Sequence, residues 1–152
     1  MEASQLQRTL RNHVTRATLW QARGRYHEAE DELQAALRLA EREANPESLE
    51  LAETASALGV LLETLGKPAD AEGALRTAVR IYERAYGPDH PRLAEPLGAL
   101  GAVRQLRGDL AEAERLYQRA LAIARGRGLA VHRLNPPPDS TAQMGSRSAR
   151  ST

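Results

Sequence analysis

The chain has 152 residues, of which 41% are hydrophobic, 27% charged and 3% aromatic, with no Cys and a formal net charge of +1. This length and composition are typical of one globular domain and exclude a fibrous or membrane-spanning class. The lack of Cys excludes a disulfide framework, a thiolate nucleophile and a zinc-finger ligand set. The first residues, Met1 to Gln5, lack the basic-then-apolar order of a secretory signal, so we expect a cytoplasmic protein.

The residue types favour helices along the whole chain. There are 27 Ala, 22 Leu and 20 Arg, against one Lys and no Phe. Ala, Leu and Arg are among the strongest helix formers, and the β-branched and aromatic residues that favour strands are scarce. The composition therefore predicts an all-α fold.

A repeat with a period of 42 residues organises the chain. Gly24, Gly66 and Gly108 are spaced at this interval, and many other residues coincide at the same offset. The coinciding groups are Ala29-Glu30 with Ala71-Glu72 and Ala113-Glu114, and Ala36-Leu37 with Ala78-Val79 and Ala120-Leu121. We therefore expect a repeat domain over residues 5–126, with units at about 5–45, 46–89 and 90–126.

Each unit is predicted to contain two helices around its glycine, because apolar residues recur at helical spacing on both sides of it. Glycine can end the first helix with a positive φ angle. Asp109 is suited to cap the last helix. Pro96 lies near the start of the helix expected at 92–107 and predicts that this helix starts late or is kinked. The expected helices are 5–23, 26–43, 48–65, 68–86, 92–107 and 110–125.

Small residues predict where the helices meet. Gly59 and Gly101 lie in mid-helix, where glycine costs about 1 kcal/mol relative to Ala. We expect close approach of the partner helix to compensate for this cost, with Ala71 and Ala113 on the other side of the contact. Since no single hairpin of this kind can bury its apolar stripe, stacking of hairpins must form the core.

The segment Gly108-Asp109-Leu110-Ala111-Glu112-Ala113-Glu114 and the residues after it resemble a tetratricopeptide repeat. The turn Tyr86-Gly87-Pro88-Asp89-His90-Pro91 and the period of 42 are similar to the kinesin-light-chain-like subclass. This resemblance, over about residues 10–125, implies a right-handed α-solenoid of three hairpins with six or seven helices. It also implies a protein-binding scaffold, or alternatively a sensor or adaptor arm of a signalling system.

In such superhelices, residues of each first helix line the concave face, which holds a peptide or protein partner. The matching residues here are Arg11, Thr18, Gln21, Glu53, Ser56, Val60, Glu63, Glu95, Ala102 and Gln105, with Val14 and Gly98 beside them. Among these residues, those from the second and third repeat units include three acids and no base. We therefore expect a mildly acidic groove that favours a partner with Lys or Arg flanking small apolar residues, the alternative being a merely solvated face.

The sequence offers little catalytic chemistry. His90 follows Asp89 but lies in the turn between repeats, where capping or packing is the expected role. His27 has acids three and four residues later but lacks the second His of a zinc-protease motif. No nucleophile elbow, phosphate loop or dinucleotide fingerprint occurs. We predict no enzymatic activity, no cofactor, no metal, and neither a membrane nor a nucleic-acid partner.

The end of the chain departs from the repeat. Residues 127–152 form a basic tail, and its Pro-rich and Ser/Arg-rich part, 135–152, is predicted to be disordered. The last hairpin would then leave a face open, formed by Leu116, Ala120, Leu121 and Ile123. Three explanations remain open. Residues 129–134 fold back over this face, a second copy covers it in a weak homodimer, or the chain is a truncated array whose further repeats once covered it.

Overall fold

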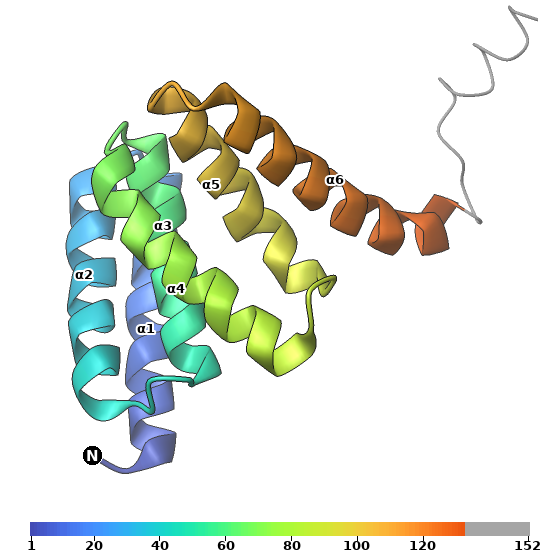
Figure 1. The fold of residues 1–152 in the computed structure, drawn as a ribbon. Coiled ribbons are helices and arrows are strands. Elements are labelled where there is room, and N and C mark those ends of the chain that lie inside the picture. The colour runs from blue at the N-terminus through green and yellow to red at the C-terminus, as the bar shows by residue number, and fades with distance from the viewer. Residues whose placement is uncertain (133–152) are drawn as a thin grey trace, which may run out of the picture.

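A computed structural model describes the backbone of residues 1–132 and the side chains of residues 1–126. In it, three antiparallel helical hairpins lie side by side, from α1 and α2 at one end to α5 and α6 at the other (Figure 1). The elements are α1 (Ala3–Ala22), α2 (Tyr26–Glu43), α3 (Leu49–Thr64), α4 (Pro68–Tyr86), the 3₁₀ turn η1 (Pro91–Leu93), α5 (Ala94–Leu106) and α6 (Leu110–His132). The all-α prediction is confirmed over these residues. The predicted disorder of 135–152 lies outside them.

The turns inside the hairpins follow the sequence prediction. Gly24, Gly66 and Gly108 have φ angles of +74°, +75° and +84°, which glycine adopts without steric cost. Asp109 caps α6, because its Oδ1 accepts a hydrogen bond of 3.3 Å from the backbone N–H of Glu112. The three repeat glycines therefore end the first helices as predicted.

The last hairpin departs from the expected helix bounds at two places. The helix expected at 92 begins as η1, and α5 starts only at Ala94, so the late start suggested by Pro96 is confirmed. The end expected for α6 at residue 125 is wrong, because α6 continues to His132. Gly126 does not adopt a positive φ angle, and the strong helix formers Leu and Ala follow it in the sequence, so nothing local ends the helix there.

The core is continuous through the stack. Within each hairpin the two helices pack on each other, and α2 also packs on α3 as α4 does on α5. Leu33, Leu75 and Val103 are fully buried, and so are Ala36 and Ala78 at equivalent positions of the second helices. Each hairpin thus covers apolar surface that its neighbour would otherwise expose to water.

The close approach inside each hairpin differs from the expectation in the residue that lies nearest each glycine. A Cβ atom on Gly59 would lie 2.5 Å from Cγ of Leu75, and one on Gly101 would lie 2.8 Å from Cδ1 of Tyr117. Ala71 and Ala113 are buried, but they do not supply the atoms nearest to these Cβ positions. The expected close approach of the second helix is therefore confirmed, and the glycines leave space for a large side chain, Leu75 or Tyr117, as the nearest neighbour.

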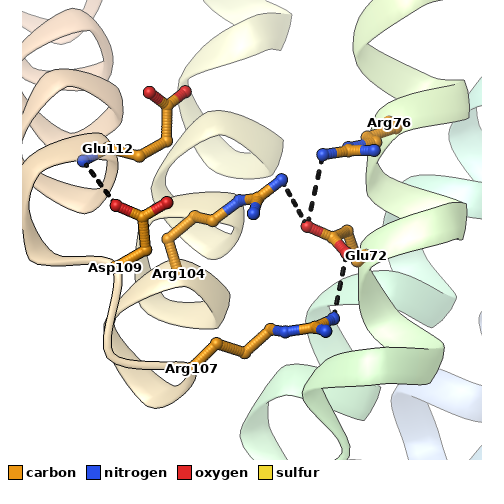
Figure 2. Close-up of polar contacts among 6 residues, drawn as sticks. All are labelled: Glu72, Arg76, Arg104, Arg107, Asp109 and Glu112. Atoms are coloured by element: carbon orange, nitrogen blue, oxygen red, sulfur yellow. Dashed lines mark hydrogen bonds and ion pairs between the residues drawn. The ribbon is translucent and has the colours of Figure 1, made fainter.

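Two glutamates, one repeat apart, join each of the first two hairpins to the next. Both oxygens of Glu30 accept hydrogen bonds from Nζ of Lys67, at 2.8 and 3.0 Å. Glu72 lies between two arginines of the last hairpin, with Oε1 2.6 Å from Nη2 of Arg104 and Oε2 accepting from Nη1 of Arg107 at 3.1 Å (Figure 2). The two glutamate side chains are only 10% and 16% exposed, so solvent screens these pairs poorly.

Replacing Gly59 tests the close approach to Leu75. Gly59→Ala should lower the free energy of unfolding by roughly 1–2 kcal/mol, because overpacking outweighs the gain in helix propensity. Gly73→Ala is the matched control in α4, since a Cβ there meets no atom within 4 Å, and it should raise stability by about 0.5–1 kcal/mol. Urea unfolding followed by circular dichroism measures both. Equal stabilisation by the two substitutions would contradict the packing described here.

Replacing Glu72 tests the ionic junction between the second and third hairpins. Glu72→Ala should destabilise the fold by roughly 1–3 kcal/mol, because Arg104 loses a partner in a half-buried position. Glu41→Ala, on the exposed side of α2, serves as the control and should change stability by less than about 0.5 kcal/mol. A loss for Glu72→Ala no larger than the control's, in the same urea titration, would contradict a structural role for the junction.

Candidate functional site

The first helices of the three hairpins form one continuous surface, because α1 contacts α3 and α3 contacts α5. We name this surface the first-helix face. The ten residues predicted for partner binding all lie on these three helices. Exposed are Arg11, Thr18, Glu53, Glu95 and Gln105, and half-buried are Gln21, Val60, Glu63 and Ala102. Ser56 is buried, so it offers a partner little surface.

A hollow of about 200 Å³ opens on this face between α1 and α3. Its walls are Gln7, Leu10, Arg11, Val14, Leu49, Glu50, Glu53 and Thr54. Leu10 and Val14 supply apolar surface, whereas Arg11 and Glu53 supply opposite charges. The volume is below the range of about 300–1,000 Å³ typical of small-molecule sites, so the hollow suits a single side chain of a partner.

A strip of small side chains also lies on the first-helix face, on α3 and α5. Val60 and Ala102 are half-buried, and a Cβ added to Gly98 would meet no atom within 4 Å. Small side chains at these positions let another backbone approach closely. The strip is therefore a shallow apolar surface rather than a deep cleft.

The charge of this face differs from the expectation of three acids and no base. Arg92, on η1, donates from Nη1 to Oε1 of Glu53 at 2.8 Å. A hydrogen bond with the Tyr82 hydroxyl, and then the charge of Glu53, raise the pKa of the Arg92 guanidinium. Burial raises the pKa of Tyr82 itself. The charge of Glu53 is thus already compensated by Arg92, and the acidity of the face rests on Glu50, Glu63 and Glu95, which have no ion pair among the described side chains.

Sequence reasoning missed Arg92 because it is the first residue of the expected helix 92–107 and lies ahead of the positions aligned with the concave face. The repeat offset contains the signal, since Arg8, Glu50 and Arg92 occupy equivalent positions three residues ahead of Arg11, Glu53 and Glu95. A second contact was also missed. The hydroxyl of Tyr117 donates to Oε1 of Gln105 at 3.0 Å, so that amide is partly engaged within its own hairpin.

The histidine of the inter-repeat turn has a structural role. Nδ1 of His90 accepts from the backbone N–H of Arg92 at 3.2 Å, and its ring stacks on Tyr86 with centroids 4.0 Å apart. The expected capping and packing role is confirmed. Within the described part of the chain, no three His, Asp or Glu residues are grouped so that they could hold a metal ion. None of the helices in that part is long and apolar enough to cross a membrane.

The open face expected on the last hairpin is largely closed. Ala120 and Ile123 are buried, and Leu116 packs against the core, so only Leu121, which is 53% exposed, remains of the four predicted residues. The other three are turned toward the core by the helical phase of α6. Fold-back of residues 129–132 is also wrong, because these residues extend α6. Residues 133 and 134 lie outside the described part.

Together, the three stacked hairpins and their continuous first-helix face define a helical-repeat scaffold. A family model described as the tetratricopeptide repeat matches residues 8–84 and 65–126. The chain belongs to the tetratricopeptide repeat family. A search of curated proteins gives no match.

Two solved structures illustrate the similarity. BtubC (BKLC) from P. vanneervenii has a TM-score of 0.68 and 26% identity, over 75% of this chain and 45% of that chain. The TPR domain of Arabidopsis FLU has a TM-score of 0.67 and 22% identity, over 80% of this chain and 98% of that chain. The present chain thus spans less than half the length of BtubC. Both similarities agree with the fold predicted from the repeat.

Removing Arg92 tests the charge balance of the first-helix face. Arg92→Ala should lower stability by less than about 1 kcal/mol, because both partners of the pair are about half exposed. It should also make the face more acidic, so that a tetralysine peptide binds more tightly than to the wild type at low salt. Chemical shift changes in ¹⁵N spectra measure this binding. Arg115→Ala on α6 is the control, and an equal gain for both variants would show a nonspecific charge effect.

Proposed function

We propose that this chain binds a peptide segment of a partner protein along its first-helix face, without catalysing a reaction. Tetratricopeptide repeats are protein-binding scaffolds, which supports the general role. The observation that carries the specific proposal is the hollow between α1 and α3, whose walls are partly apolar and partly charged, together with the strip of small side chains on the same face. A hollow and a strip of this size match one anchoring side chain and a closely approaching backbone.

The charges on the face describe the chemistry of the partner. Glu63 follows Val60 by three residues on α3, and Glu95 precedes Gly98 by three residues on α5. Neither acid has an ion-pair partner among the described side chains. A basic residue of the partner would be attracted to Glu63 or Glu95. It would be attracted less to Glu53, whose charge is already paired with Arg92. The proposed ligand is thus a segment with one apolar anchor, small apolar residues after it, and a flanking Lys or Arg.

The subclass and compartment are part of the same proposal. The period of 42 and the Tyr86–Pro91 turn support the kinesin-light-chain-like subclass, and the similarity to BtubC (BKLC) is compatible with it. The pair of Asn residues that this subclass commonly uses to grip a peptide backbone is replaced here by Ser56-Ala57 and Gly98-Ala99. We therefore place the binding energy in the hollow and the flanking charges. We assign the chain to the cytoplasm.

Selection from a displayed peptide library, followed by fluorescence anisotropy on the selected peptides, tests this function. Selected peptides should share an apolar anchor and a basic flank. Ala102→Trp should weaken their binding at least roughly ten-fold by filling the strip, and Glu63→Lys with Glu95→Lys should weaken it by a similar factor through charge reversal. Affinity should also fall as salt rises, because the charged rim is exposed.

Asp31→Lys provides the matched charge reversal on α2, away from the first-helix face, and should leave the affinity unchanged. If the selected peptides bind the wild type, Ala102→Trp, the double glutamate variant and Asp31→Lys with equal affinity, the binding site lies elsewhere. Failure of the library to give any binder would contradict the peptide-binding function itself.

A further inference from the structure

The outer side of α6 carries a row of exposed residues that we name the end stripe. Its members are Leu110, Glu114, Gln118, Leu121 and Arg125. Their spacing of three and four residues places them on one side of the helix. Leu110 and Leu121 are 65% and 53% exposed, so the stripe includes two of the four exposed leucines of the described residues. In Figure 1, α6 lies at the end of the stack, with α5 on one side and no described helix on the other.

In the first two hairpins, residues in the middle of the equivalent stripe contact the next hairpin. Val79, the counterpart of Leu121, is buried and lies beside Leu100 of α5. Glu30 and Glu72 are the counterparts of Glu114. Glu30 binds Lys67 of the following hairpin, and Glu72 binds Arg104 of the hairpin after that (Figure 2). The repeat has therefore kept on α6 the acid and the apolar residue that form a hairpin junction.

On α6 these groups lack such a junction within the described residues. Oε1 of Glu114 accepts only from Nε2 of Gln118 on the same helix, at 3.3 Å. Leu121 remains exposed to water. The end stripe thus has the composition of a docking surface with no following hairpin seated on it among residues 1–132.

The other end of the stack is unsuited to cover the end stripe. His13 and Arg16 of α1 stand at the repeat positions that the buried Ala55 and Leu58 occupy in α3. Both bind Glu32 of α2, with His13 Nδ1 2.6 Å from Oε2 and Arg16 Nε 3.2 Å from Oε1. A polar, internally paired end is typical of a capping repeat. A head-to-tail array of copies would bury these charges against Leu121, which is costly.

We propose that the end stripe binds the end stripe of a second copy, in an antiparallel dimer with two-fold symmetry. With the axis between residues 119 and 120, each Glu114 lies opposite Arg125 of the second copy, so the stripe is complementary to itself in charge. The two Leu121 side chains lie next to the axis, each beside Gln118 of the second copy. Two ion pairs thus flank a centre of two leucines and two glutamines, an arrangement that two-fold symmetry makes the same for both copies.

The dimer is expected to be weak. One helix from each copy forms the contact, which is small beside the roughly 1,600 Å² of a standard protein interface. A dissociation constant on the order of 10 µM is therefore reasonable. The first-helix face is formed by other helices, so this dimer leaves it accessible.

Sedimentation equilibrium of the full chain, from about 1 to 200 µM, tests the proposal around that constant. The wild type should shift from the mass of a monomer to twice that mass. Glu114→Arg and Arg125→Glu should each raise the dissociation constant at least roughly ten-fold, because each places like charges opposite one another twice. The variant carrying both substitutions should return to within a few-fold of the wild type, since the two-fold axis pairs each reversed residue with the other.

Leu121→Asp should abolish dimerisation, and Arg115→Glu, on the same helix but off the stripe, should leave it unchanged. Because all these positions are exposed, the variants should keep the wild-type circular dichroism spectrum. A monomer at every concentration would overturn the proposal. A dimer that persists in Leu121→Asp, or one that the double charge reversal fails to restore, would place the interface elsewhere and overturn it equally.

Discussion

The junction between successive hairpins is the interaction on which the rest of this structure depends. A single hairpin buries one side of its helices and leaves a second apolar stripe, which only the next hairpin can cover. Val79 is buried in this way. Glu30 and Glu72, which occupy the same repeat position, add an ion pair at each of the two junctions. Stacking also places the first helix of each hairpin beside the first helix of the next, as α1 contacts α3 and α3 contacts α5. The candidate binding face is therefore a consequence of the same contacts that stabilise the fold.

The period of 42 residues made most of the fold predictable. Apolar spacing located the helices to within a few residues, and the repeated glycine located the turns, because both signals are local and occur three times. The end of α6 was missed, since Gly126 resembles a stop signal but keeps a helical backbone. The partner of Gly59 was missed for another reason. Which residue of the second helix faces a glycine depends on how the two helices are rotated, and Leu75 and Ala71 both lie on the facing side.

Placing the functional residues from sequence worked less well, because charge balance depends on three-dimensional neighbours. The alignment put the predicted residues on α1, α3 and α5, but it did not reveal that Arg92 neutralises Glu53 across 39 residues of sequence. The same limit explains the last hairpin. Leu116, Leu121 and Ile123 are alike in sequence, yet the rotation of α6 turns only Leu121 outward. Comparison with Val79 at the same repeat position is what identifies it as a junction residue.

If the junctions hold the stack together, protection of the backbone must be greatest where a hairpin has a neighbour on both sides. Amide hydrogen exchange of the dilute chain tests this claim most directly. The account predicts that the core amides of α3 and α4 exchange most slowly, because both junctions must open to expose them, and that α1 and α6 exchange faster. Slowest exchange in α1 or α6, or fast exchange in α4 beside protected outer helices, would contradict it.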